Sequence, residues 1–538
     1  MAVRTADEAY EREREAQDSR ATTPGAPHAS PITVAWPLTA VSVNVRVVAA
    51  VLLVALTVVA YLPALHAGFV WDDDLNLTAN PLVRDLAGLR QMWLEPVAWY
   101  QYYPLTFSTF FVEYHLWGTH PFGYHLDNVL LHALNAVLVW LLLRELRLPG
   151  AWLAAAIFAL HPIQVESVAW IAERKNVLSG AFFLTALLAY LRGTLQPQER
   201  SSARREWYSC AAACLLFVAA LLSKTATCSL PAVAFLLTWW RRGVADRRAL
   251  WTLAPLVVAG IVMASTTVWI ERHHAGAEGE EWALSTVERL LIAGRAAWFY
   301  IGAFLWPRSL TFVYPRWTVD VHAWGQYVYP VGATLVIGIL VAARRRLHAG
   351  PLVAALCYAA TLAPALGFFN VYFMRYSFVA DHFAYLPSIT LSALAGAAGE
   401  AVIHRQRRSA RVAAAVGCAG LLLLLGVLTW RQTGIYRDVR TLWTDTLQKN
   451  PACWLAHNNL GLLLWEGGEV DAAIAHWQAA LRWNPNDVEA HFNLGAALHQ
   501  QGHLTAAIAE YREALRLDPT HSAARQDLDI ALAAQAHP

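Results

Sequence analysis

The segment VRVVAAVLLVALTVVAYLPALHAGFVWDDD, residues 45–74, joins an apolar stretch directly to three consecutive aspartates. Residues 45–70 are long enough to cross a bilayer as a helix, which takes about 20 apolar residues. Asp72, Asp73 and Asp74 then stand at the membrane border, where carboxylates are costly to desolvate and repel one another unless water, a cation or a substrate compensates. A simple anchor does not need them, so their placement indicates chemistry at the membrane surface on a lipid-linked substrate.

The composition of the chain is typical of a membrane protein. Of its 538 residues 57% are hydrophobic and only 15% are charged, whereas a soluble domain carries about 25% charged residues. The net charge of +2 gives no reason to expect nucleic acid binding. The cysteines follow no metal-ligand spacing, so we interpret them as packing thiols rather than as disulfides or a zinc site; they are Cys210, Cys214, Cys228, Cys357, Cys418 and Cys453.

The positions of the arginines predict the orientation of the membrane segments. Residues 1–44 read as a disordered cytoplasmic tail, and arginines recur in loops that therefore belong on the inside. With the N-terminus inside, the pattern fits eleven crossings if 287–306, which contains Arg295 and ends at Pro307, does not cross. Everything after Trp430 then lies outside. The other expected apolar segments are 126–143, 150–168, 176–193, 207–222, 226–240, 249–270, 325–343, 350–369, 383–403 and 411–430.

The C-terminal part of the chain is a repeat with a period of 34 residues. The motif HNNLGLLLWEGGEVDAAIAHWQAALRWNP recurs as HFNLGAALHQQGHLTAAIAEYREALRLDP, and Pro451, Pro485 and Pro519 keep the same spacing. This period is that of tetratricopeptide repeats, which are paired helices. We expect a half-repeat at 436–450, two full repeats and a capping helix at 521–535. The predicted fold is therefore all-α, with a polytopic membrane domain over 45–435 and a short repeat solenoid over 436–538.

Asp72 and Asp73 are the first candidates for chemistry. A general base that deprotonates a hydroxyl acceptor is well served by a carboxylate that both the acceptor and a lipid-bound donor can reach. The alternative is a solvated acidic loop. The rest of this first outside loop, about 67–125, is rich in aromatic residues, which fit either an aromatic belt at the membrane surface or sugar stacking; they include Trp93, Trp99, Tyr100, Tyr102, Tyr103 and Trp117.

A second candidate is HPIQVESVAWIAERKN, residues 161–176, at the outer end of the third span. Pro162 is expected to break the helix, so that His161 and Glu166 face the same outer vestibule as the aspartates. Arg174 and Lys175 are cations on the side that usually lacks them, and they are suited to holding the phosphate of a polyprenyl carrier. The alternative is that these residues cap a turn and pair with one another.

Further candidates lie at the ends of later spans. Lys224 in LLSKTATCSLP is one of only three lysines, and it is either a snorkelling anchor or a phosphate contact. The stretch FMRYSFVADHFAYLPSI places four polar residues beside the penultimate span, where they either pair structurally or frame a site: Arg375, Asp381, His382 and Tyr385. His273 and His274 lie in a loop with three glutamates, which we interpret as solvated.

Together these features resemble the transmembrane and tetratricopeptide-repeat containing O-mannosyltransferases and their bacterial relatives, which have the GT-C fold. The resemblance extends over nearly all of the chain after residue 45 and rests on several motifs together: FVWDDDLNLTANP, YPLTFSTF with FGYHLDNVLLHALNA, HPIQVESVAWIAERKN, LLSKT, VADHFAYLPS and the repeats. It implies that Asp72 or Asp73 supplies the catalytic carboxylate. It also implies a polyprenyl-phosphate monosaccharide donor and transfer to a hydroxyl with inversion. Two departures are that His382 stands where relatives tend to have Arg, and that the repeat tail is shorter than in animal members.

The resulting hypothesis is a membrane glycosyltransferase on the extracytoplasmic face. It places Lys224, Arg174 and Lys175 near the donor phosphate and gives Glu166 a role in orienting acceptor or base. The chemistry requires no cofactor, and a divalent metal is left open. The acceptor is a protein or glycan, docked on the repeats.

Two alternatives belong to other classes, and a third is a closer rival. A transporter or flippase would place acidic residues within the spans, and a non-catalytic scaffold presenting the repeats would need neither the aspartates nor Lys224. A lipid-linked glycan ligase or polymerase differs only in donor and acceptor. The preference for Arg over Lys suggests a bacterial inner membrane, with a cytoplasmic N-terminus and extracytoplasmic repeats.

Overall fold

The computed structural model describes residues 43–195, 203–243, 247–279, 282–346, 348–405 and 407–536. The expected tail at 1–44 therefore lies outside the described residues except for its last two. Within the described ranges the chain is helical and contains no β-strand, as the sequence predicts. Residues 49–538 form one compact unit, and the description that follows concerns this unit.

Seven helices of the described ranges are long and apolar enough to cross a membrane, or eight if one bent pair counts as a single span. The chain is therefore a membrane protein, but the predicted total of eleven crossings is not confirmed. Helix α12 (Thr286–Leu305), the counterpart of the segment expected not to cross, is not among the seven. The helices that qualify are α2 (Val43–Ala60), α5 (Pro121–Glu145), α8 (Arg174–Thr194), α9 (Ala203–Ser223), α11 (Arg247–His273), α13 (Val328–Ala343) and α16 (Arg408–Thr433).

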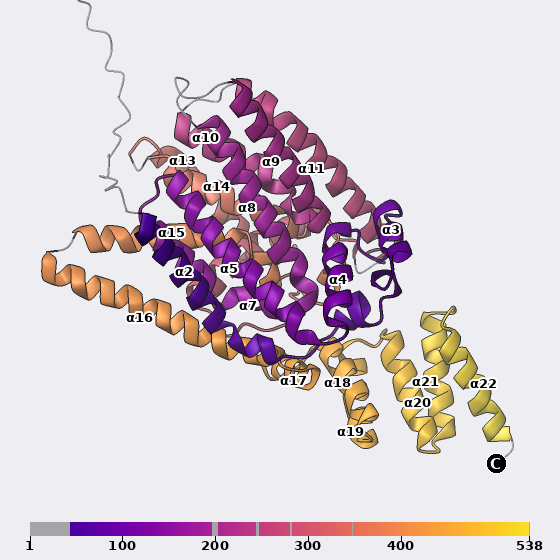
Figure 1. Cartoon of the computed structure of the whole chain (residues 1–538). Helices are drawn as coiled ribbons and strands as arrows, with labels where there is room; N and C mark the ends of the chain where they lie inside the picture. The colour runs from indigo at the N-terminus through magenta and orange to yellow at the C-terminus, as the bar shows by residue number, and fades with distance from the viewer. Residues whose placement is uncertain are drawn as a thin grey trace, which may run out of the picture. The chain divides into compact units, whose positions relative to one another are not determined.

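The centre of the membrane part is built on α5, α6 (Ala151–Leu160) and α8 (Figure 1). Helix α6 is a run of small and apolar residues, AWLAAAIFAL, and most of it is buried. Its alanines let α15 (Pro387–Arg405) approach closely, and the closest contact joins Gly150 to Gly396. Helix α8 is buried along nearly its whole length.

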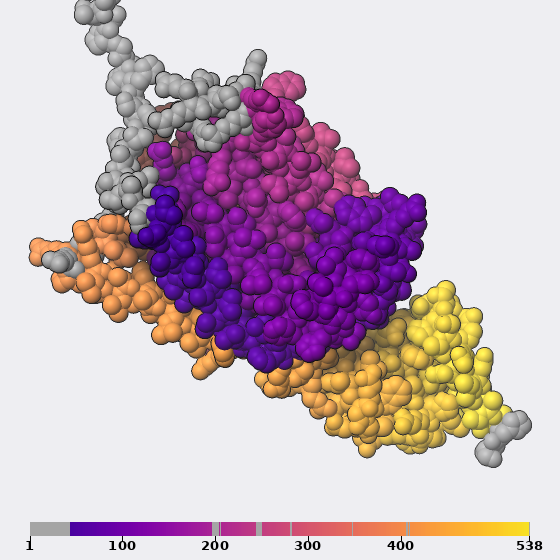
Figure 2. Space-filling model, in the orientation of Figure 1, coloured from indigo at the N-terminus to yellow at the C-terminus, as the bar shows by residue number. Residues whose placement is uncertain are grey.

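The helix breaks at Pro162 as predicted. Helix α6 ends at Leu160, a single turn spans Pro162–Gln164, and α7 (Val165–Ala169) continues at a bend of 54°. A second short turn, Ile171–Glu173, leads into α8. Proline lacks the N–H of a continuous helix and clashes with the preceding turn. The break therefore turns the chain before α8. The first loop lies at the surface and is seen in violet in Figure 2.

The repeats form helix pairs stacked in order (Figure 1). In each full repeat, a glycine of the first helix faces the large ring of the second: a Cβ on Gly461 would lie 2.8 Å from Trp477, and one on Gly495 would lie 2.8 Å from Tyr511. This close packing explains the spacing of both residue types in the sequence. The helices are α17 (Val439–Lys449), α18 (Trp454–Glu466), α19 (Val470–Trp483), α20 (Val488–Gln500), α21 (Leu504–Leu517) and α22 (Ser522–Ala536).

The half-repeat helix α17 packs into the core of the preceding part. Trp443 is fully buried and meets the ring of Trp71 edge-on at 6.0 Å. The Nζ of Lys449 donates to the carbonyl of Leu310 at 2.7 Å, and the amide of Asn450 donates to the carbonyl of Val313 at 3.1 Å. Helix α17 is thus part of the structure that supports the first loop.

The close approach of α6 and α15 predicts an unequal effect of two alanine substitutions. Gly150 and Gly243 both have positive φ, 66° and 76°, so alanine costs roughly 1 kcal/mol at either position. A Cβ on Gly150 would also lie 2.0 Å from the carbonyl oxygen of Gly396, whereas one on Gly243 meets nothing within 4 Å. We expect Gly150→Ala to lose roughly a further 1–3 kcal/mol of unfolding free energy. Thermal unfolding in detergent measures both, and equal shifts would contradict this packing.

Candidate functional site

A cavity of about 750 Å³ opens beside the first aspartates. Its wall comes from the first loop, the start of α8, the residue after α9, the end of α11 and the segment 371–383. Three carboxylates and two lysines line it, together with a set of aromatic rings. The lining residues that carry charge or aromatic rings are Trp71, Asp72, Trp99, Tyr100, Tyr103, Trp170, Glu173, Lys175, Lys224, Glu271, His274, Tyr372, Phe373, Tyr376, His382 and Phe383.

Asp73 anchors the first loop. Its side chain is completely buried, with Oδ2 accepting from the backbone amide of Val70 at 2.8 Å and Oδ1 accepting from that of Ala172 at 2.7 Å. Both carboxylate oxygens are thereby used inside the protein. The bond to Ala172 ties the loop to the turn before α8.

Asp72 has a different environment from its neighbour. It lines the cavity, and its Oδ1 is buried with no hydrogen-bond donor among the described residues. Burial raises the pKa of Asp72 to about 6, because the raising effect of desolvation outweighs the lowering effect of Lys175. A carboxylate that has one oxygen without a donor and a pKa of about 6 is suited to accepting a proton.

The backbone of Trp71 is strained. Its φ of 46° is unusual for a bulky residue. The ring stacks on Trp170 at 5.4 Å and meets Phe312, Tyr376 and Trp443 edge-on. These packed aromatic rings hold the conformation, so the residue just before Asp72 is fixed in space.

The opposite charge in the cavity comes from two lysines that share one carboxylate. Lys224 Nζ lies 2.9 Å from Oε2 of Glu173, and Lys175 Nζ lies 3.0 Å from Oε1 of the same residue. Burial lowers the pKa of Lys224, and Glu173 counteracts this. Two ammonium groups and one carboxylate give this cluster a formal charge of +1.

His382 lines the cavity and is held from behind by Glu166. Its backbone N–H donates to Glu166 Oε2 at 3.1 Å, and its Nδ1 lies 2.9 Å from Glu166 Oε1. Burial lowers the pKa of His382 to about 3, so the ring is neutral near pH 7. If Nδ1 carries the proton and donates to the carboxylate, Nε2 is left as an acceptor. Glu166 itself does not line the cavity, contrary to the expectation that it faces the vestibule.

Arg174 and His161 also lie away from the cavity. The guanidinium of Arg174 is buried, contacts Glu113 and Asn128, and donates to the carbonyl of Tyr124 at 2.8 Å. It therefore joins α4 (Pro104–Trp117) to α5 and α8. His161 stacks on Phe304 with ring centres 4.4 Å apart. Neither side chain lines the cavity that contains the two lysines.

The four residues predicted beside the penultimate span have four different surroundings. Asp381 accepts a hydrogen bond from the hydroxyl of Tyr314 at 2.8 Å, and burial raises the pKa of Asp381 to about 7. The hydroxyl of Tyr385 lies 2.9 Å from Nδ1 of His132 in the bundle interior. Arg375 lies over the ring of Trp454, 5.5 Å away, at the first full repeat. Of the four, only His382 lines the cavity.

Sequence reasoning missed Glu173 and Glu271. Glu173 immediately precedes the basic pair of a motif that was already singled out, and Glu271 is an acid at the end of an apolar helix, which is itself a signal of function. Glu271 accepts from the amide of Tyr372 at 3.0 Å. His274, interpreted as part of a solvated loop, is exposed but lines the cavity. Of the aromatic residues in the first loop, Trp99, Tyr100 and Tyr103 reach the cavity, whereas Trp93, Tyr102 and Trp117 do not line it.

No group of three or more His, Cys, Asp or Glu side chains in the described ranges is arranged to hold a metal ion. The carboxylates of the cavity instead face ammonium groups. Asp72 is influenced by Lys175, and Glu173 is bonded to both lysines.

Comparisons with known proteins agree with the resemblance predicted from the sequence. A tetratricopeptide-repeat family model matches residues 423–482 and 460–522. The protein O-mannosyl-transferase Tmtc1 of Drosophila melanogaster is 38% identical over 182 residues, 32% of this chain and 20% of that protein. The protein O-mannosyl-transferase F38B6.6 of Caenorhabditis elegans is 23% identical over 450 residues, 80% of this chain and 62% of that protein. The chain thus spans less than two thirds of the length of either relative.

Two solved structures are matched over much of this chain at low similarity. The Archaeoglobus fulgidus oligosaccharyltransferase is matched with a TM-score of 0.43 and 14% identity, covering 75% of this chain and 57% of that one. ArnT from Cupriavidus metallidurans bound to undecaprenyl phosphate is matched with a TM-score of 0.39 and 13% identity, covering 88% of this chain and 80% of that one.

The shared carboxylate predicts a large effect of Glu173→Gln on stability. The substitution leaves two buried ammonium groups without their counter-charge, and removing one partner of a buried ion pair costs roughly 3–5 kcal/mol. We expect a loss of that order in the unfolding free energy, measured by titrating the detergent-solubilised protein with SDS.

Two further variants test whether the loss of stability comes from the buried lysines or from the removal of any carboxylate. Glu278→Gln breaks a surface pair with Arg272, 3.1 Å apart, and should cost less than about 1 kcal/mol. Adding Lys175→Met to Glu173→Gln should recover part of the loss. A double variant as unstable as the sum of the two single variants would contradict the coupling.

Proposed function

We propose that this chain is a membrane glycosyltransferase that moves a mannose-type monosaccharide from a polyprenyl-phosphate donor to a hydroxyl acceptor. The observation that carries the proposal is that Asp72 and the cluster of Lys175, Lys224 and Glu173 line the same cavity. A general base and a positively charged site for an anion are the two groups that a glycosyl transfer from a lipid phosphate needs. The names of the relatives support the same activity.

In the proposed reaction the two lysines bind the donor phosphate, and the sugar lies among the aromatic rings near Asp72. The acceptor oxygen attacks the anomeric carbon while Asp72 takes its proton. The bond between that carbon and the phosphate oxygen breaks, and the polyprenyl phosphate leaves with the bonding electrons, stabilised by the lysines. A single displacement inverts the anomeric centre. Nε2 of His382 is available to accept a hydrogen bond from a sugar hydroxyl.

For the acceptor we propose Ser or Thr of a protein that docks on the repeats. Tyr376 lines the cavity, and its ring lies 5.3 Å from that of Trp454 at the start of α18. Along the next helices Asn493 donates to Asn458 at 3.3 Å, so amide groups continue from one repeat to the next. A peptide that follows this face therefore reaches the cavity at Tyr376. The same proposal includes the GT-C fold and a domain boundary at 435/436. It also includes a bacterial inner membrane as the location, with a cytoplasmic N-terminus and extracytoplasmic repeats.

The choice of Asp72 over its neighbours predicts the outcome of three asparagine substitutions. With polyprenyl-phosphate mannose or glucose as donor and Ser/Thr-rich peptides as acceptor, Asp72→Asn should lower kcat by about 10²–10⁴ because the proton acceptor is lost. Asp74→Asn is the matched control, since Asp74 is exposed and bonds to Thr78 within its own turn, and it should keep wild-type activity. Asp73→Asn should instead lower stability, because an amide offers only one acceptor oxygen to two backbone amides. Full transfer by Asp72→Asn would overturn the mechanism.

The pKa of about 6 for Asp72 also predicts the pH dependence of transfer. The base works only when it is ionised, so kcat/KM should be constant above that pKa and fall by about tenfold per pH unit below it. His382, with a pKa of about 3, contributes no step near neutral pH. Initial rates of label transfer across this range give the profile. A flat profile through pH 6 would contradict Asp72 as the base.

A further inference from the structure

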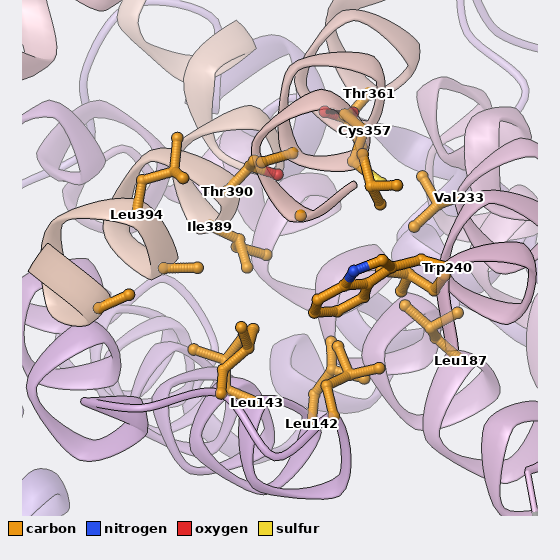
Figure 3. Close-up of a pocket in the computed structure, with 18 of the residues that line it drawn as sticks. Leu142, Leu143, Leu187, Val233, Trp240, Cys357, Thr361, Ile389, Thr390 and Leu394 are labelled. Atoms are coloured by element: carbon orange, nitrogen blue, oxygen red, sulfur yellow. Dashed lines mark hydrogen bonds between the residues drawn. The ribbon is translucent and has the colours of Figure 1, made fainter. Parts of the chain in front are cut away.

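A second cavity, of about 440 Å³, lies inside the helix bundle (Figure 3). Its wall is formed by α5, α8, α10 (Leu230–Arg242), α14 (Gly350–Leu362) and α15. Figure 3 shows Leu142, Leu187, Ile389 and Trp240 directed into one space, with threonine hydroxyls at its edge. One of these, Thr361, already donates to the carbonyl of Cys357 at 2.8 Å. The lining is therefore almost entirely hydrocarbon.

This cavity is separate from the one beside Asp72. The two have no lining residue in common. Along α8, Lys175 lines the first cavity and Phe183 the second, and a buried polar layer lies at the level between them. In that layer the amide of Asn135 donates to the carbonyl of Val177 and to the hydroxyl of Tyr385, at 2.8 Å each.

An apolar space of this size needs an apolar occupant. Protein interiors contain few voids larger than a water molecule, and water requires polar partners that this wall does not offer. If each methylene takes up roughly 30 Å³, the volume of a water molecule in the liquid, the space holds about fifteen of them. That is the length of one fatty acyl chain. Leu394, which is 44% exposed, lies on the edge of the cavity, where a chain can enter from the bilayer.

The same cavity is bordered by arginines. Arg147 stands between the lining residues Leu146 and Leu148, and Arg241 follows the lining residue Trp240. Arg344–Arg346 come just before the lining residue His348. Burial, and then the charge of Arg147, lower the pKa of Arg241, so the two guanidinium groups lie within electrostatic range of each other. Each of three separate lining segments thus has an arginine next to it, or nearly so, in the sequence.

We propose that this cavity binds one acyl chain of an anionic glycerophospholipid, with the lipid phosphate held at Arg147 and Arg241. The combination of a hydrocarbon pocket and a basic border matches both parts of such a lipid. A polyprenyl carrier fits less well, because the buried layer at Asn135 and Tyr385 separates this space from the lysines that would hold its phosphate. The inference does not depend on the proposed catalytic activity.

The test is native mass spectrometry of the full chain in detergent with dioleoyl phosphatidylglycerol or dioleoyl phosphatidylcholine. We expect one phosphatidylglycerol per chain to be retained and phosphatidylcholine to bind more weakly. Arg147→Gln and Arg241→Gln should each weaken retention by about fivefold, the effect of one basic residue at an anionic lipid surface. The control is Arg204→Gln, which changes an exposed arginine at the start of α9 that adjoins no lining residue, and it should bind as wild type.

The acyl site is tested with Ala393→Trp, which fills the cavity and should abolish retention. Should that variant fail to fold, the arginine variants still decide the outcome, since they leave the packed interior unchanged. Equal retention of phosphatidylglycerol by wild type and the double arginine variant would overturn the proposal. Displacement of the lipid by polyprenyl phosphate at equal concentration would also overturn it and assign the cavity to the donor's tail.

Discussion

The two backbone hydrogen bonds accepted by Asp73 are the constraint on which the first loop depends. They join Val70, at the end of the first apolar segment, to Ala172, just before α8. With both sides of the loop fixed, Trp71 is held at a positive φ between aromatic neighbours. Asp72 is then left facing the cavity rather than the protein interior. The buried carboxylate of Asp73 thus fixes the position of the neighbouring carboxylate that lines the cavity.

The sequence was sufficient to predict the helical repeats and the break in a helix, because both depend on local patterns. Spacing predicted the repeats, and Pro162 predicted the bend between α6 and α7. Asp72, Lys175 and Lys224 were also singled out, since charge at a membrane border is visible in the sequence, and all three line the cavity. The different surroundings of Asp72 and Asp73 could not be predicted from the sequence, because they depend on a backbone amide 99 positions away. Arg174 and Lys175 are adjacent in the sequence, but one side chain enters the α4–α5 contact and the other the cavity.

The repeats are not simply appended to the membrane part. Trp443 packs against Trp71, and Gly68 donates its backbone N–H to the carbonyl of Arg437 at 2.9 Å. A cut at residue 436 therefore removes packing from beneath the first loop as well as the repeats. Deletion of 436–538 cannot separate a scaffold from an enzyme for this reason. A cut after α17 preserves these contacts and is the better division between the two roles.

The arrangement of Glu173 between two lysines has a consequence for the choice among phosphorylated lipids. The cluster has one positive charge in excess, which equals the single negative charge of a phosphodiester such as a polyprenyl-phosphate sugar. A diphosphate-linked sugar brings a second negative charge into a wall that already contains Asp72 and Glu271. Its extra charge has no partner there, and an unpaired charge in a partly buried site is strongly disfavoured. Within the proposed mechanism, the single excess charge of this lysine cluster therefore matches one phosphate group better than two.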